Sequence, residues 1–214
     1  MLTKFVCLAN SFKEGGRCMA GIELDSESNP VFEKGKPKWI RPVCSTKHGE
    51  IPTEIVAHFK LLDIVEINII EKQPQGYQSE NVIFDERSLK ICGSFKREEL
   101  SKLCNTHSVI FGNFDKSVSL DEIEALNHSL LFLKLNEFEA VNKIYEDKKD
   151  RPQTRLIFSH NGNQYDFPIT DPSFLHRFKV RPNLIKNKNE IYVCSSLGIL
   201  WKNSFYKLIA GIVY

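Results

Sequence analysis

The order of predicted secondary structure recurs along the chain, and this recurrence limits the folds that the chain can adopt. Each half contains three strands, a helix and two strands (β-β-β-α-β-β), with no letter-for-letter repeat. The strands are runs rich in β-branched and aromatic residues, bounded by turn-forming residues. The first half has strands at 4–9, 17–24, 38–43, 61–72 and 80–84 and a helix at 52–59; the second has a bent strand at 130–135 and 137–145, strands at 154–159, 164–169, 190–195 and 205–213, and a helix at 171–178.

This order matches the OB-fold, a five-stranded Greek-key barrel. We therefore predict a mainly β protein with two OB-like five-stranded barrels, at 1–84 and 128–214, and a helical connector at 85–127. An SH3-like barrel or one continuous sheet with inserted helices is the alternative.

Several helix ends carry residues that favour capping. Thr53 and Ser119 are candidate N-caps, Asp171 is another, and Pro172 suits the first helical position after it. Within the connector, helices are expected at 96–105 and 120–126.

The first half has a candidate binding surface. An OB-fold binds its ligands on strands 2 and 3 and on the loops that join strands 1 to 2 and 4 to 5. The first strand 1 to 2 loop carries cations beside a glycine pair that lets a ligand approach the backbone, and alternate residues of the third strand share one face. The residues expected to converge on phosphate and base are Lys13, Gly15, Gly16, Arg17, Trp39 and Arg41.

The second half repeats this arrangement more weakly. Trp201 and Lys202 are expected in its strand 4 to 5 loop. The cations of its strand 1 to 2 loop lie between Asp147 and Asp150, which partly cancel their charge. They are Lys148, Lys149 and Arg151.

Five stretches resemble the bacterial dual-OB-containing-domain family. They are FVCLANSFKEGGRCMAG near the start, WIRPV, PITDPSF, SSLG and the C-terminal YKLIAGIVY. The resemblance spans both halves. It implies two OB units and a nucleic-acid or nucleotide role in bacterial conflict or defence systems, and it supplies no catalytic residue.

Charge and cysteine usage set further bounds. The net charge of +2 excludes a uniformly basic coat, so a nucleic-acid surface has to be a local patch. One basic patch contains Lys34, Lys36, Lys38, Arg41 and Lys47, and the other contains Arg177, Lys179, Arg181, Lys186 and Lys188. With neither a signal peptide nor a membrane span, a cytoplasmic protein with six reduced cysteines is expected.

The sequence favours a nucleic-acid or nucleotide binding module without evident catalysis. No Walker-type phosphate loop, dinucleotide fingerprint or nucleophile elbow occurs, and no cofactor is expected. Cys44 with His48 and Cys104 with His107 are too widely separated to favour zinc. The alternatives are an enzyme or sensor that binds a phosphate ligand through the glycine loop, and an adaptor for an effector protein.

Overall fold

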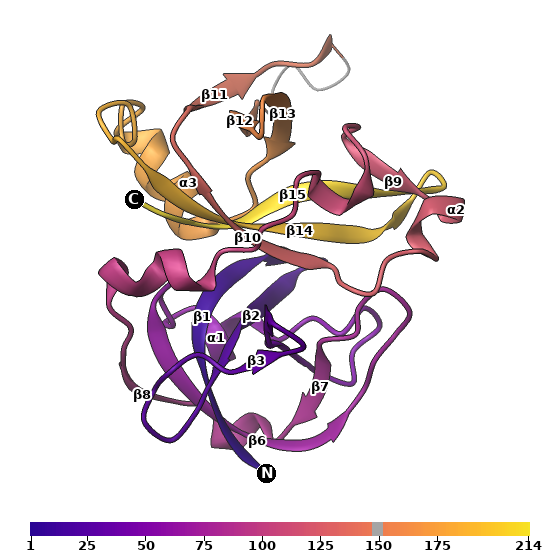
Figure 1. The fold of residues 1–214 in the computed structure, drawn as a ribbon, viewed down its shortest axis with the longest axis vertical. Coiled ribbons are helices and arrows are strands. Elements are labelled where there is room, and N and C mark those ends of the chain that lie inside the picture. Colours follow the sequence, from indigo (N-terminus) through magenta and orange to yellow (C-terminus); the bar gives the residue numbers. More distant parts are fainter. Residues whose placement is uncertain (147–151) are drawn as a thin grey trace.

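The computed structural model describes residues 1–146 and 152–214 and is mainly β. Two units, each built around strands, lie one above the other in Figure 1. The N-terminal half forms the lower unit, and most of the later strands form the upper one. The predicted fold class is confirmed, whereas the domain boundaries at 84 and 127 stay a prediction.

The first unit is a closed barrel of five strands in the order β1-β2-β5-β7-β6, in which β6 pairs back onto β1. Only β5 and β7 pair in parallel among these neighbours. The barrel strands are β1 (Leu2–Lys13), β2 (Gly16–Leu24), β5 (Trp39–Val43), β6 (Asp63–Lys72) and β7 (Asn81–Phe84). The helix α1 (Thr53–Val56) precedes β6, and β3 (Phe32–Glu33) and β4 (Lys36–Pro37) form a small hairpin between β2 and β5.

The connecting segment contains short helices and two strands. These elements are η1 (Glu86–Ser88), β8 (Lys90–Ser94), η2 (Arg97–Leu103), η3 (Ile110–Gly112), β9 (Ser117–Ser119) and α2 (Leu120–Ile123). The expected helix at 96–105 is a 3-10 helix, and β8 and β9 extend the two units' sheets by pairing with β6 and β15. The connector therefore contains short helices, as expected, together with two strands that the sequence did not predict.

The second unit has the same order of elements as the first, and its strands form two linked sheets that curl into a half-barrel. One sheet has the order β10-β14-β15-β9 and the other β11-β12-β13, and a parallel bridge from Ile169 to Ile209 links them. Its elements are β10 (Leu130–Leu135), β11 (Phe138–Lys143), β12 (Gln153–His160), β13 (Asn163–Pro168), α3 (Pro172–Val180), β14 (Ile191–Trp201) and β15 (Ser204–Val213). Lys148, Lys149 and Arg151 lie outside the described residues.

Two of the three predicted caps form. Ser119 makes a capping box with Glu122 at α2, and the Asp171 carboxylate accepts from the backbone N–H groups of Ser173 and Phe174 at α3. Thr53 is instead the first residue of α1, which follows Pro52 without a side-chain cap. The helix therefore begins one residue earlier than a cap at Thr53 predicts.

A shared apolar layer joins the two units. The strands β1 and β2 turn one face into the first barrel, and their outer faces pack against β10, β14 and β15. The layer contains Val6, Leu8, Ala20, Ile22, Leu24, Leu130, Phe132, Tyr192, Cys194, Ala210 and Val213, and Phe95, Leu100 and Leu103 of the connector extend it. Because these residues are buried, the layer fixes how the units are arranged.

Gly211 lies where β15 crosses β1. A Cβ at position 211 would lie 2.1 Å from the backbone oxygen of Leu8. We expect Gly211→Ala to lower the free energy of unfolding by about 1 to 3 kcal/mol, because the backbones must move apart and loosen the shared apolar layer. Denaturation in urea measures this change.

Gly93→Ala is the matched control, because the nearest atom to its added Cβ is Ile64 Cδ1 at 3.5 Å, an ordinary contact. Equal stability of the two variants would show that the crossing tolerates a wider spacing.

Candidate functional site

The outer face of strands 2 and 3 of the first barrel lies against the second unit. Ala20, Ile22 and Leu24 of β2 belong to the shared apolar layer, and Trp39 of β5 packs at its margin. The surface on which an OB-fold is expected to bind is therefore covered here, except at the edge that carries Trp39.

Arg41 lies beneath the second unit and is 1% exposed. Its Nη2 is 3.1 Å from Glu80 Oε1 and 3.5 Å from Ser196 Oγ, and Ser129 Oγ donates to the same Glu80 oxygen. Desolvation opposes the charge, but Glu80 and other neighbours raise the pKa of Arg41 overall, so the guanidinium stays charged. Arg41 is thus a paired structural cation, and the expected convergence with Lys13, Arg17 and Trp39 on an open face does not occur.

Lys13 and Arg17 lie on opposite faces of the first hairpin. Phe12 pairs with Arg17, and the next pair along the ladder is Lys13 with Gly16. Neighbouring pairs point to opposite faces of a sheet, so the two cations diverge. The turn between them has Gly15 at φ +86°, as its glycine suggests.

Arg17 faces a hollow beside α3. Its guanidinium lies 4.5 Å over the Phe12 ring, and its Nε and Nη1 are buried without a hydrogen-bond partner in the protein. His58, His176 and Arg177 line the same hollow. Burial lowers the pKa of Arg17.

Lys13 lines a different hollow, of about 490 Å³, which we call the amide groove. The described residues that line it include no acidic side chain; they are Lys13, Val43–Gly49, Gln73, Gln75, Tyr77, Gln78, Asn81, Ile199 and Leu200. Tyr77 ties the first barrel to the second here, because its hydroxyl donates to the Gly198 backbone oxygen at 3.1 Å. The groove thus offers lysines for phosphates and amides for base edges.

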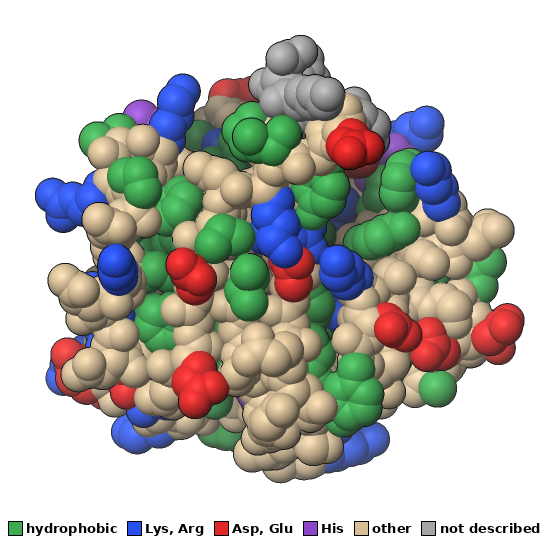
Figure 2. All heavy atoms as spheres, turned by 90° about the horizontal axis from the view of Figure 1, so that it is seen from above, with side chains coloured by type: hydrophobic (Ala, Val, Ile, Leu, Met, Phe, Trp, Pro, Cys, Tyr) green, Lys and Arg blue, Asp and Glu red, His purple; other side chains and the backbone are tan. Residues whose placement is uncertain are grey.

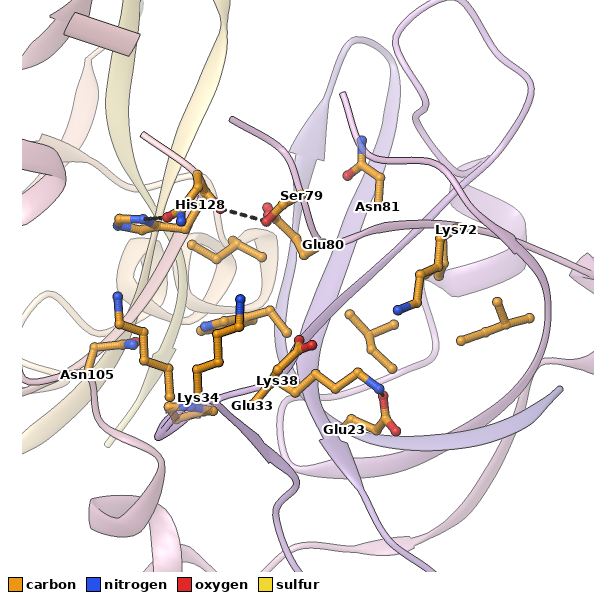
Figure 3. A pocket seen from close by; sticks show the side chains of 18 of the residues that line it. Glu23, Glu33, Lys34, Lys38, Lys72, Ser79, Glu80, Asn81, Asn105 and His128 are labelled. Carbon is orange, nitrogen blue, oxygen red and sulfur yellow. Dashed lines mark hydrogen bonds and ion pairs between the residues drawn. The ribbon is translucent and has the colours of Figure 1, made fainter. Parts of the chain in front are cut away.

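A third hollow, of about 600 Å³, opens between the units and is called the interbarrel cleft (Figure 3). Trp39 lies in its wall, and Lys34 and Lys72 lie on opposite sides of it. Lys38 is paired with Glu23 at 2.6 Å. The first basic patch of the sequence therefore contributes Lys34, Lys36 and Lys38 to one wall of the cleft.

Two histidines complete the cleft: His107 of the connector and His128, which lies just before β10. The rings of His107 and His128 are 5.0 Å apart. Burial, together with His107 and the charge of Lys36, lowers the pKa of His128 from 6.5 to about 4. Burial, Lys36 and His160 likewise lower the pKa of His107. Both imidazoles are therefore neutral at pH 7, when each has one nitrogen that donates and one that accepts.

The aromatic platform consists of Trp201 and Tyr206 at the tip of the β14–β15 hairpin. Trp201 is 54% exposed and Tyr206 is 38% exposed, with their rings 5.5 Å apart. Lys202 Nζ lies 4.4 Å from the Trp201 ring. Trp201 is the last residue of β14 rather than part of a long loop, because Lys202 and Asn203 close a tight turn with positive φ.

The cations on the β12–β13 side of the second unit are already paired. Asp166 binds Arg155 at 2.5 Å and Lys143 at 2.6 Å, and Lys116 lies 3.9 Å away. Figure 2 looks onto the upper unit and shows Lys and Arg side chains interspersed with acidic and hydrophobic ones. This side is a mixed surface rather than a basic one.

Sequence reasoning missed Tyr206, His107, His128 and Lys72. A signal existed for Tyr206, because the pairing of Trp201 with Ser204 puts residue 206 on the same strand face. The sequence marks His107 only by its spacing from Cys104, as a zinc pair, and no pattern marks His128; His107 lies in an irregular segment of the connector and His128 just before β10.

The architecture defines a protein of two fused OB-like units, one a closed barrel and the other a curled half-barrel. The model of the dual OB-containing domain family matches residues 3–212. The chain belongs to this family, which confirms the predicted resemblance to dual-OB proteins.

Comparison with solved structures gives five matching chains. One comes from a replication protein A heterotrimer bound to single-stranded DNA; it is 14% identical, with a TM-score of 0.35, over 98% of this chain and 48% of that chain. The present chain thus spans about half the length of that chain. No curated protein matches the sequence.

The described residues hold no group of three or more His, Cys, Asp or Glu side chains that could bind a metal ion, and no described helix is long and apolar enough to cross a membrane. The described cysteines are free, but Cys92 is exposed rather than buried.

Removal of Arg41 tests its structural role. We expect Arg41→Ala to lower the free energy of unfolding by about 3 kcal/mol or more, because Glu80 would stay buried without its cation. Chemical denaturation measures the loss. Lys102→Ala, which breaks the exposed pair with Glu99, is the control and should cost less than about 1 kcal/mol. Arg41→Ala as stable as this control would contradict the assignment.

Protonation of His128 should make stability depend on pH. Its pKa is about 4 in the fold against 6.5 ordinarily, so between these values the unfolded chain binds more protons. Stability is therefore expected to fall as the pH is lowered through this window. His128→Asn should flatten that dependence in denaturation curves, and His176→Asn, on the exposed side of α3, should leave it unchanged. A slope unaffected by His128→Asn would refute the assignment.

Proposed function

We propose that this protein binds single-stranded nucleic acid and that the aromatic platform stacks on its bases. The observation that carries the proposal is the exposure of Trp201 and Tyr206 side by side. Large aromatic side chains are mostly buried, and an exposed pair with a cation beside it suits the face of a base. Such stacking contributes about 1 to 3 kcal/mol per base and tolerates any base.

The position of the platform supports the proposal. It lies on the hairpin between the last two strands of the second unit, and the loop joining strands 4 and 5 is a ligand-binding element of the OB-fold. A binding role for this loop does not need the strand 2 to 3 face, which the shared apolar layer covers in the first unit.

The amide groove supplies the remaining contacts. Leu200 lines the groove, whereas Trp201, the next residue of β14, points to the opposite face of the hairpin, so a bound strand would pass around the end of the β14–β15 hairpin to reach both surfaces. Lys13 and Lys47 would contact phosphates, and Gln73, Gln75 and Gln78 would face base edges. The proposal thus keeps the predicted phosphate contact of Lys13, but on a different surface from Arg17.

Binding of labelled single-stranded DNA and RNA, followed by anisotropy at several salt concentrations, tests the proposal. Trp201→Ala is expected to weaken binding by about 1 to 3 kcal/mol with little change of the salt slope. Lys13→Ala should reduce the slope of log K against log salt by about 0.7, the value for one phosphate contact on a single strand.

Two variants serve as controls. Phe32→Ala removes an aromatic side chain that is 50% exposed on the first unit, and Lys96→Ala removes an exposed lysine that belongs to neither basic patch. Both should bind like the unchanged protein. Absence of binding at low salt, or equal affinities of Trp201→Ala and Phe32→Ala, would refute the proposal.

A further inference from the structure

The interbarrel cleft has features that the proposed strand-binding surface does not use. Its walls come from both units, including His128 just before β10, and from the connector, which contributes Asn105, His107 and Asn127. Its volume of about 600 Å³ lies within the range of small-molecule sites. The cleft is thus large enough for a ligand of its own.

Buried polar atoms without a partner gather around this cleft. Among the described residues, four such atoms belong to side chains that line it: Trp39 Nε1, Asn81 Oδ1, His107 Nδ1 and His128 Nε2. Buried polar groups in folded proteins are nearly always hydrogen-bonded, so a cluster of orphans marks a place where a ligand can supply the partners.

The hydrogen-bonding chemistry of these atoms limits the kinds of ligand that fit the cleft. The indole N–H donates and the Asn81 oxygen accepts. His128 Nδ1 donates to Asn127 Oδ1 at 3.3 Å, which leaves its Nε2 as an acceptor, while His107 Nδ1 can donate or accept. A ligand that satisfies them has to present donors and acceptors on one rigid edge, as a nucleobase does. The indole ring and the neighbouring Val82 and Ile69 provide the apolar wall against which a planar base can lie.

Cations surround the same cleft. Lys34 and Lys36, on the β3–β4 hairpin and its turn, and Lys72, at the end of β6, line it without an ion-pair partner among the described residues. Lys36 is close enough to both histidines for its charge to lower their pKa values. Four acidic residues also line the cleft: Glu23 and Glu80, which are paired with Lys38 and Arg41, and Glu33 and Glu71. The unpaired lysines therefore favour a compact anion rather than a long polyanion.

We propose that the interbarrel cleft binds a nucleoside phosphate, with the base against Trp39, Asn81 and His128 and the phosphate on Lys34 and Lys36. This site goes beyond the proposed strand-binding surface and is separate from it. Because its walls come from both units, the bound ligand would also hold the units together.

The two tryptophans allow ligand binding at the two sites to be measured independently. The chain has two, and they lie at different sites, with Trp39 in the cleft and Trp201 on the aromatic platform. In the Trp201→Phe protein, we expect the fluorescence of Trp39 to change when at least one of ATP, GTP, CTP, UTP or their monophosphates is added. The same nucleotide should raise the melting temperature, because it binds only the folded state.

Variants of the cleft define the contacts. Lys36→Ala should weaken nucleotide binding about tenfold, the loss expected for one charge-assisted contact. Lys96→Ala, which removes an exposed lysine that does not line the cleft, should leave it unchanged. Adenosine and tripolyphosphate should each bind more weakly than ATP, since each lacks one half of the proposed ligand.

Three results would overturn the proposal. The first is that no nucleotide changes either Trp39 fluorescence or the melting temperature. The second is that tripolyphosphate binds as tightly as the nucleotides, which would make the cleft a plain anion site. The third is that only oligonucleotides move the Trp39 signal, which would assign the cleft to the path of a strand. The strand-binding proposal is tested separately, by the fluorescence of Trp201 in the Trp39→Phe protein.

Discussion

The contact between the outer faces of β1 and β2 and the sheet of β10, β14 and β15 is the constraint on which the rest of the structure depends. At its centre the backbones of β1 and β15 cross so closely that only glycine fits at position 211. This contact buries the surface that an isolated OB barrel uses for its ligand. The hollows that could bind something therefore lie around the margin of the shared apolar layer, where Arg17, Lys13 and Trp39 each face a different one.

The architecture could be predicted from the sequence because short local patterns encode each of its elements. Each strand needs only a short apolar run between turn-forming residues, and the recurrence of the element order carried the prediction of two barrels. Helix ends were predictable for the same reason, since Ser119 and Asp171 act on their own neighbouring backbone. The short strands β3, β8 and β9 escaped prediction because pairing with other segments, rather than their own composition, makes them strands.

The candidate site was harder to predict from the sequence because it depends on how one unit covers the other. The alternation rule placed Trp39 and Arg41 together, but only the docking of the second unit decides that Arg41 is buried beside Glu80. One signal was present: the run from Met19 to Ile22 is apolar on both strand faces, which is typical of a strand with no solvated side. The divergence of Lys13 and Arg17 could likewise have been read from the hairpin register.

The crossing of β1 and β15 also bears on how the chain is made. A ribosome releases the first barrel long before residues 204–213 emerge. During that interval Val6, Leu8, Ala20 and Ile22 form an apolar outer face with nothing to cover it. Exposed faces of this kind favour aggregation of nascent chains. The first barrel therefore forms early, but its apolar outer face is fully covered, and protected from self-association, only when synthesis reaches the last strand.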